Sequence, residues 1–234
     1  MNKKIVITGG SGRFGQEIKK IPSNYKIFYP SSKILNIANE LSIKNYLRKI
    51  RPKFLLHIAG MSRPMKEHEE NISKSIELNI IGTANIVKVC SSMKIKLVYI
   101  STGYVYPGEK GNYKETDPLR PWNNYGWSKL GGEASVQMYK NSLILRANIS
   151  QSPFIHKKAF KNIKINFLYQ NEAARIILKL INKKGIINLG GNSNSVYDFA
   201  KRTNPNVKKI YLKNSKYPKN LTMHTGKLKK LVKI

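Results

Sequence analysis

A glycine-rich turn near the start of the chain constrains its fold more than any other part of the sequence. The turn reads TGGSGRFG over residues 8–15 and follows a β-branched run at residues 5–8. An amphipathic segment at residues 14–20 follows it, so the turn is expected to join a strand to a helix. The spacing of Gly9, Gly12 and Gly15 permits a tight turn, a close backbone approach to a ligand, and close packing of helix on strand. Because free N–H groups at the start of that helix favour an anion, the turn predicts a site for the pyrophosphate of a dinucleotide.

Strand-like apolar runs and helical patterns alternate along most of the chain. Further strands are expected at residues 25–29, 54–59, 96–101, 142–146 and 186–189, and helices at residues 39–50, 75–92, 125–139, 171–182 and 196–202. The basic segment 156–164 is expected to be a surface loop. This alternation is typical of βαβ units with right-handed crossovers. We therefore predict an α/β fold with a Rossmann-type, doubly wound parallel sheet in residues 1–146. Residues 147–234 are expected to form a small C-terminal substrate-binding lobe, partly interleaved with the main sheet.

The residues at the end of the second expected strand bear on the choice of nicotinamide cofactor. NAD sites usually place an acidic residue there, which binds the ribose hydroxyls. This chain has Ser31, Ser32 and Lys33 instead, with two hydroxyls and a cation but no carboxylate to repel a phosphate. Arg13 in the turn adds a planar guanidinium that can bind a phosphate. The sequence therefore favours NADP(H), and the alternative is that Lys33 and Arg13 are simply solvated.

A tyrosine and a lysine, Tyr125 and Lys129, lie four residues apart on one face of an expected helix. A free phenol has a pKa of about 10, and a nearby ammonium moves that pKa towards the working pH, so that the tyrosine can exchange its proton. Thr102 follows an expected strand, where a hydroxyl is placed to bind a substrate carbonyl. The three residues predict a catalytic set, although Tyr125 and Lys129 alone could be an exposed helix pair.

Together these motifs resemble those of the extended short-chain dehydrogenase/reductases, and the resemblance covers nearly the whole chain. The glycine turn matches TGxxGxxG, the segment HIAG at residues 57–60 resembles HxAA, STGYVY at residues 101–106 resembles STxxVY, and residues 125–129 match YxxxK. Asn79 matches the asparagine that precedes the family's long helix. The resemblance implies hydride transfer between a nicotinamide and a sugar carbon. It also implies that Tyr125 donates the proton, Thr102 orients the carbonyl and Lys129 tunes Tyr125.

Within this family the chain is most similar to the dTDP-4-dehydrorhamnose reductases, through PLRP at residues 118–121 and YGWSKLGGE at residues 125–133. That similarity implies NADPH-dependent reduction of a nucleotide-linked 4-keto-6-deoxy sugar. Gly103 and Tyr104 stand where the related 4,6-dehydratases carry an Asp-Glu pair, so elimination of water is not expected. Two alternatives stay open, a nucleotide-sugar epimerase and a catalytically silent NADP(H)-binding partner subunit. The short substrate lobe and Gly103, where the reductases commonly carry an aspartate, keep the silent subunit open, whereas the intact set of Thr102, Tyr125 and Lys129 speaks against it.

The residues expected at the site fall into three groups. The catalytic group is Thr102, Tyr125 and Lys129. The cofactor-binding group is Gly9, Gly12, Arg13, Phe14, Gly15, Ser31, Ser32, Lys33, Asn36, Ile37, Ala59, Gly60, Asn79, Tyr125 and Lys129. The substrate-binding group is Met61, Ser62, Thr102, Gly103, Tyr104 and Asn148. Met61, Ser62 and Tyr104 could equally be ordinary packing residues.

The formal net charge of the chain is +31, which raises the question of a nucleic-acid partner. The lysines are spread over nearly every segment, and no stretch concentrates aromatic and basic residues together. Compositional bias therefore explains the charge better than specific nucleic-acid binding, and a positive field would also attract an anionic substrate and cofactor.

The remaining features point to a protein of a reducing cytoplasm without metal or membrane. Cys90 is the only cysteine, so no intrachain disulfide can form. The four histidines show no metal-ligand spacing, and no apolar run is long enough to span a bilayer. The expected partner is a nucleotide-sugar substrate. A homodimer through the helices at residues 75–92 and 125–139 is expected by analogy only.

Overall fold

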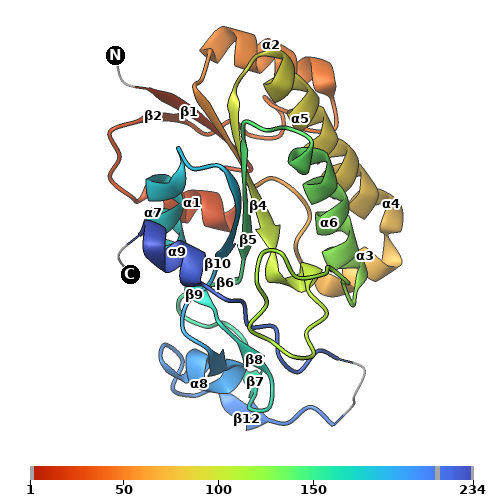
Figure 1. Cartoon of the computed structure of the whole chain (residues 1–234), viewed down its shortest axis with the longest axis vertical. Coiled ribbons are helices and arrows are strands. Elements are labelled where there is room, and N and C mark those ends of the chain that lie inside the picture. Colours follow the sequence, from red (N-terminus) through yellow and green to blue (C-terminus); the bar gives the residue numbers. More distant parts are fainter. Residues whose placement is uncertain (1–2, 214–216, 233–234) are drawn as a thin grey trace.

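A sheet of six parallel strands forms the centre of the molecule, with strand order β10-β5-β4-β3-β1-β2 (Figure 1). The computed structural model describes residues 3–213 and 217–232. The strands are β1 (Lys4–Thr8), β2 (Lys26–Phe28), β3 (Phe54–His57), β4 (Lys96–Thr102), β5 (Ser142–Ala147) and β10 (Gly185–Leu189). The chain runs outward from β1 to β2 and then returns to place β3 on the other side of β1. The strand order therefore reverses between β1 and β3, and ligands of doubly wound sheets bind at such a switch point.

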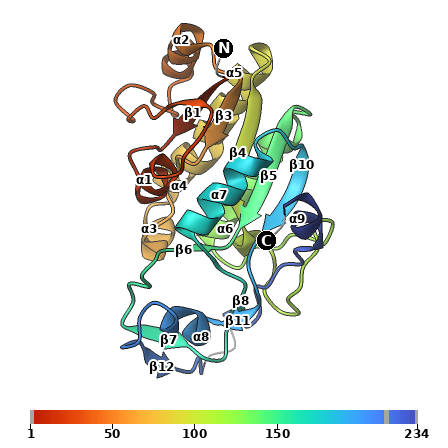
Figure 2. The same cartoon turned by 90° about the vertical axis from the view of Figure 1, so that its left-hand side faces the viewer.

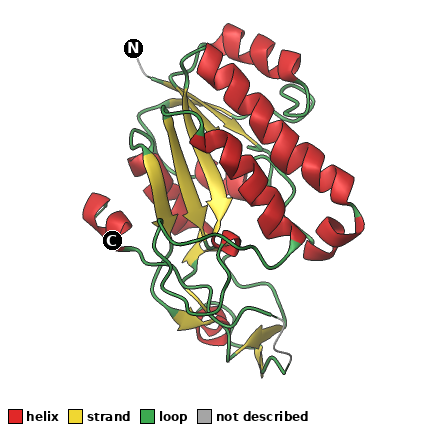
Figure 3. Ribbon diagram, turned by 45° about the vertical axis from the view of Figure 1, so that its right-hand side comes forward, coloured by secondary structure: helices red, strands yellow, loops and turns green. Residues whose placement is uncertain are grey.

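Helices cover both faces of this sheet, which confirms the predicted Rossmann-type fold (Figure 3). On one face, α2 (Glu40–Ile50), α5 (Gly82–Ser92) and α6 (Asn124–Gln137) pack on strand residues such as Val6 and Leu97. On the other face, α1 (Arg13–Lys19), α7 (Gln170–Leu180) and α9 (Gly226–Leu231) pack on residues such as Ile7 and Val98. Strands that are buried on both faces need continuous apolar runs, and this is the pattern seen in the sequence.

The helix expected at residues 75–92 is longer and less regular than the sequence indicates. It begins with α4 (Ile72–Ser75), continues through a π-helical segment η1 (Ile76–Ile81), and ends as α5. The side chain of Asn71 caps its start by accepting a hydrogen bond from the amide of Lys74 at 3.1 Å. A further short helix, α3 (Met65–Glu70), precedes it and was not expected from the sequence. The π-helical segment carries Asn79 and packs against α6.

The C-terminal part of the chain is divided between the sheet and a small lobe below it (Figure 2). Helix α7, strand β10 and helix α9 belong to the main layers. The lobe contains three two-stranded pairings and one helix: β6 (Ile149–Ser150) with β9 (Leu168–Tyr169), β7 (Lys158–Phe160) with β12 (Lys208–Ile210), β8 (Lys164–Ile165) with β11 (Asn194–Ser195), and α8 (Val196–Lys201).

The segment 156–164 is not the plain surface loop that its basic character indicates, because it contains strand β7. Lys158 is exposed, Ala159 is buried in the lobe and Phe160 is half-buried, so the strand shows only one fully buried position. Such a short strand cannot be recognised from alternation alone. Within residues 3–213 and 217–232, we find no helix with the length and apolar character needed to cross a membrane.

Candidate active site

A cavity of about 1300 Å³ lies between the sheet and the lobe, at the carboxyl ends of β1, β3, β4 and β5. The cavity thus lies at the edge of the sheet where the strand order reverses, and the lobe forms its other wall. Most of the residues expected at the site line it: Gly9, Gly12, Arg13, Phe14, Gly15, Ala59, Gly60, Met61, Ser62, Thr102, Tyr104, Tyr125, Lys129 and Asn148.

The glycine turn closes tightly on the neighbouring loop, and side chains would not fit at its key positions. Gly9 has φ +71°, and a Cβ there would lie 2.8 Å from the backbone of Ala59. A Cβ on Gly15 would lie 2.5 Å from Gly10, so only glycine lets α1 approach the turn. The amide of Gly12 donates to the carbonyl of Gly9 at 2.9 Å, and Gly12 itself lines the cavity. The turn therefore leaves a bare backbone cradle of the kind that a pyrophosphate needs.

Thr102 and Tyr125 lie together at the sheet end of the cavity. Thr102 ends β4, and its hydroxyl accepts a hydrogen bond from the amide of Tyr104 at 3.2 Å. Tyr125 lies in the first turn of α6, whose start is capped by Asn123. Burial raises the pKa of Tyr125 to about 12, while a hydrogen bond with Thr102 opposes that rise. The phenol therefore keeps its proton at neutral pH and is set up to donate it.

Lys129 lies one helical turn after Tyr125 and is almost fully buried. Its ammonium lies 4.2 Å from the centre of the Tyr99 ring, a cation–π contact in the protein interior. Burial lowers the pKa of Lys129 to about 7, and the carboxylate of Glu133 opposes this shift. The sequence predicts that Lys129 lowers the pKa of Tyr125. In this structure burial has the largest effect and raises the pKa of Tyr125. The neighbours that oppose this rise are Thr102 and, to a smaller extent, Arg63.

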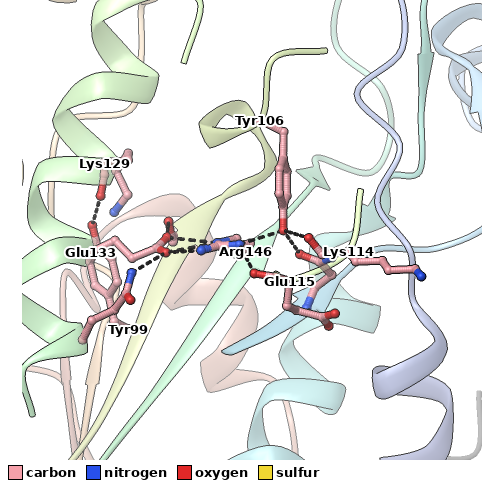
Figure 4. A network of polar contacts seen from close by, with 10 residues as sticks. Tyr99, Tyr106, Lys114, Glu115, Lys129, Glu133 and Arg146 are labelled. Atoms are coloured by element: carbon pink, nitrogen blue, oxygen red, sulfur yellow. Dashed lines mark hydrogen bonds and ion pairs between the residues drawn. The ribbon is translucent and has the colours of Figure 1, made fainter. Parts of the chain in front are cut away.

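A buried ion pair supports the catalytic strand and helix from behind (Figure 4). Nη2 of Arg146 on β5 lies 2.6 Å from Oε1 of Glu133 on α6, and both side chains are excluded from solvent. The hydroxyl of Ser101, next to Thr102, donates to the other carboxylate oxygen at 2.6 Å. On its far side, Arg146 donates to the hydroxyl of Tyr106 at 2.8 Å. The network ties β4 and α6, which carry the catalytic side chains, to β5.

Asn79 does not line the cavity, but it shapes the loop that does. Its Oδ1 accepts from the amide of Met61 at 2.8 Å, and its Nδ2 donates to the carbonyl of Met61 at 2.9 Å. The same Nδ2 donates to the hydroxyl of Ser128 on α6 at 2.9 Å. Gly60 has φ +147°, and a Cβ there would lie 2.6 Å from Oδ1 of Asn79. Asn79 therefore fixes the loop after β3 against the helix that carries Tyr125 and Lys129.

Gly103 and Asn148 are in direct contact at the substrate side. A Cβ on Gly103 would lie 2.3 Å from Oδ1 of Asn148, so the missing side chain makes room for the amide. Nδ2 of Asn148 donates to Oδ1 of Asn166 and to the carbonyl of Leu221, both at 3.2 Å. Its Oδ1 is buried at the cavity wall and has no hydrogen-bond partner among the residues that the structure describes. Gly103 itself is buried and does not line the cavity.

Five of the residues expected to bind the cofactor, all in the segment after β2, are not among those that line this cavity. Ser32, Lys33 and Asn36 are exposed on the turn after β2, and Ser31 is half-buried there. Ile37 is a core residue that packs under Gly82. None of these five residues is among the described residues that line the cavity, so their role in cofactor binding stays a prediction.

Two arginines and a glutamine form a group that the sequence reasoning assigned only in part. Nη1 of Arg13 lies 3.4 Å from Oε1 of Gln151, and Nη1 of Arg63 lies 3.1 Å from the same oxygen. Arg13 was expected to reach a phosphate beside Lys33, but here it points towards Gln151. Arg63 and Gln151 were missed because no motif contains them. Among the described residues, no group of three His, Cys, Asp or Glu side chains could hold a metal ion.

Comparisons with known proteins agree with this architecture. A reductase from Bacillus anthracis, dTDP-4-dehydrorhamnose reductase solved in complex with NADP, superimposes with a TM-score of 0.86 at 24% identity, over 98% of this chain and 91% of that one. A dTDP-4-dehydrorhamnose reductase from Clostridium acetobutylicum gives a TM-score of 0.84 at 25% identity, over 98% and 92% of the two chains.

One curated relative is methionine adenosyltransferase 2 subunit beta from Xenopus laevis, 27% identical over 63% of this chain and 47% of its own length. The matches thus span about half the length of the curated relatives. The family described as the RmlD substrate binding domain matches residues 3–177, which is well over half of the chain. The chain therefore belongs to the RmlD substrate binding domain family, within the extended short-chain dehydrogenase/reductases.

Proposed function

We propose that this protein reduces a nucleotide-linked 4-keto-6-deoxy sugar at the expense of NADPH. The observation that carries the proposal is the grouping of Thr102, Tyr125 and Lys129 in one cavity with the glycine turn. The Thr102 hydroxyl can bind a substrate carbonyl, the Tyr125 phenol can donate a proton, and Lys129 is a buried basic side chain beside them. The glycine turn in the same cavity can bind a phosphate. The similarity to solved dTDP-4-dehydrorhamnose reductases supports the choice of substrate class.

In this proposal the side chains of the chain divide the proton chemistry among themselves. The hydroxyl of Thr102 holds the substrate carbonyl oxygen, and the phenol of Tyr125 gives its proton to that oxygen as the alcohol forms. The high pKa of Tyr125 suits this direction because the phenol is protonated before the reaction. A nicotinamide cofactor would supply the hydride when bound; the glycine turn would hold its pyrophosphate and Lys129 its ribose.

The preference for NADPH over NADH rests on the turn after β2. Its exposed Ser32 and Lys33, with Ser31 beside them, offer hydroxyls and a cation without a carboxylate. The complex of the Bacillus anthracis reductase with NADP is consistent with this preference. The cofactor assignment and the division into residues 1–146 and 147–234 are both parts of the proposal.

Absorbance of NADPH, followed after a dTDP-linked 4-keto-6-deoxy sugar is added to purified protein, tests the proposal. We expect rapid oxidation of NADPH by the wild-type protein and much slower oxidation of NADH. Tyr125→Phe should reduce the turnover number by about two to four orders of magnitude, since it removes the general acid. Its affinity for NADPH should stay close to that of the wild type. Normal turnover by this variant would show that another group donates the proton.

A second candidate function is that of a catalytically silent, NADP(H)-binding partner subunit. The similarity to methionine adenosyltransferase 2 subunit beta favours it, as does Gly103, where reductases commonly carry an acidic residue. This candidate predicts tight NADPH binding, no oxidation with any keto sugar, and a stable complex with a catalytic partner protein. An intact set of Thr102, Tyr125 and Lys129 is not needed for such a role, and its presence favours the reductase.

A further inference from the structure

Among the described residues, basic side chains line the cavity without any carboxylate, and they are not spread evenly around it. Of the described residues that line it, none is an aspartate or a glutamate, whereas Arg13, Arg63 and Lys129 are cations. Lys129 faces the reacting end and Arg13 belongs to the glycine turn. Arg63 is the cation that neither the cofactor turn nor the catalytic set accounts for. It follows Ser62 in the loop after β3, on the side where the lobe closes the cavity.

The lobe wall of the same cavity lacks cations. Among its described lining residues it presents no lysine or arginine, and His156 is its only basic side chain. This lack is not a matter of composition, because the lobe is rich in lysines. Lys158 and Lys164, on strands of the lobe, are exposed to solvent instead. The wall is built largely from apolar side chains such as Phe160, Ile163 and Leu221. An anionic group on the substrate therefore has to find its cation on the sheet side.

Arg63 is held in place but not neutralised. Its guanidinium donates to Oε1 of Gln151 at 3.1 Å, and that oxygen carries no formal charge. Among the described residues, neither Arg63 nor Arg13 forms an ion pair with a carboxylate. The loop that carries Arg63 is anchored two residues earlier, where Asn79 bonds both backbone groups of Met61. One donor of this exposed guanidinium is thus bound to a neutral oxygen, while its other donors remain available to a ligand.

The field of Arg63 reaches the centre of the site. Burial raises the pKa of Tyr104 and of Tyr125, and the positive charge of Arg63 opposes both rises. Burial lowers the pKa of His156 on the lobe, and Arg63 lowers it further. Arg63 therefore shares the cavity with Tyr125 and contacts Gln151, which follows strand β6. A phosphate bound there would lie within the same cavity as the ketone that Tyr125 reduces.

We propose that Arg63 is the specificity-determining residue that binds the diphosphate of the nucleotide-linked substrate, with Gln151 holding its guanidinium in place. The inference rests on the proposed function for the identity of the substrate. It adds Arg63 as the residue that selects this substrate. A planar guanidinium matches two phosphate oxygens at once, which a lysine cannot do. Arg13 then serves the cofactor pyrophosphate, and the lobe wall receives the uncharged part of the nucleotide.

The test is the affinity of dTDP for the protein saturated with NADP⁺, measured by titration calorimetry without any turnover. Arg63→Gln should weaken dTDP binding by about ten- to one-hundredfold, since a charge-assisted pair is lost. Arg63→Lys should restore only part of that loss. Thymidine, which has no phosphate, should bind the wild type and Arg63→Gln equally. Arg13→Gln is the matched variant, and it should weaken NADPH binding more than dTDP binding.

Three results would overturn this assignment: unchanged dTDP affinity in Arg63→Gln, an equal loss of NADPH affinity in that variant, or a wild-type complex that binds neither dTDP nor pyrophosphate. The reductase proposal is judged separately by NADPH oxidation. If Arg63→Gln reduces a dTDP-linked keto sugar with the KM of the wild type, the reductase stands and this assignment is wrong. If dTDP binding depends on Arg63 but no keto sugar is reduced, this assignment stands and the reductase proposal is wrong.

Discussion

Replacing Glu133 with glutamine should destabilise the protein and shift the pH range in which it works. Glutamine keeps nearly the same shape and can still accept the hydrogen bond that Ser101 donates. It removes the charge that faces Arg146, whose Nη2 and Nε lie 2.6 Å and 3.0 Å from Oε1 of Glu133. Because both side chains are excluded from solvent, no water can replace the lost carboxylate without opening the core.

The size of the effect follows from the burial of the pair. Removing one partner of a buried ion pair costs about 3–5 kcal/mol, and the retained hydrogen bonds place this variant near the lower end. For a chain of this size, 1 kcal/mol moves the melting temperature by about 2–4 °C. Glu133→Gln should therefore melt about 6–12 °C lower than the wild type. The double variant Glu133→Gln, Arg146→Met should recover part of this loss, since it leaves no unpaired charge.

Glu133 also acts on the catalytic lysine, which gives the variant a second readout. Its carboxylate raises the pKa of Lys129 against the stronger effect of burial. In Glu133→Gln that pKa should fall below about 7, so the activity at neutral pH should drop and partly return at lower pH. Thermal denaturation and the pH profile of kcat measure the two effects. A melting temperature within about 2 °C of the wild type, with an unchanged pH profile, would refute the reasoning.

Three further changes test other parts of the site. Lys33→Glu should weaken NADPH binding at least about tenfold and NADH binding much less; an equal effect in fluorescence titrations would remove the phosphate-recognition account. Lys129→Met should abolish activity yet raise the melting temperature, because it removes a buried ammonium. The gain in melting temperature over the wild type should be largest below pH 7. It should shrink as the pH rises from about 7 towards 10.5, since in that range Lys129 of the wild type is protonated only in the unfolded state. A gain that does not change with pH would contradict the low pKa of Lys129. Gly103→Ala should push Oδ1 of Asn148 away and lower kcat/KM about tenfold, whereas wild-type kinetics would show that Asn148 is not needed where it lies.

Much of the sheet could be predicted because each of its strands is a short apolar run next to a clear turn or helix. The segment LVYI at residues 97–100 is an example, buried on both sides in the structure. The catalytic set was also visible, since Tyr125 and Lys129 share a helix face and Thr102 ends a strand. These features depend on local sequence, which is what pattern reasoning can use.

The remaining features depend on contacts between distant segments. The pair of Glu133 and Arg146 joins a helix to a strand, and neither residue stands out in its own segment. The low pKa of Lys129 comes from burial, which spacing alone does not reveal. The two-residue strands of the lobe are too short to show alternation of buried and exposed residues. Arg63 could not be recognised from its own segment, because its role follows from Gln151 and from the apolar lobe wall, which are distant in the sequence.

Transfer of deuterium from NADPH tests the central claim most directly. The protein is incubated with NADPH deuterated at C4 of the nicotinamide and with a dTDP-linked 4-keto-6-deoxy sugar, and the product is examined by mass spectrometry. We predict one deuterium at C4 of the sugar, delivered from only one of the two faces of the nicotinamide, and none with Tyr125→Phe over the same time. A sugar that is epimerised without consumption of NADPH, or one that is recovered unchanged from protein saturated with NADPH, would contradict the account.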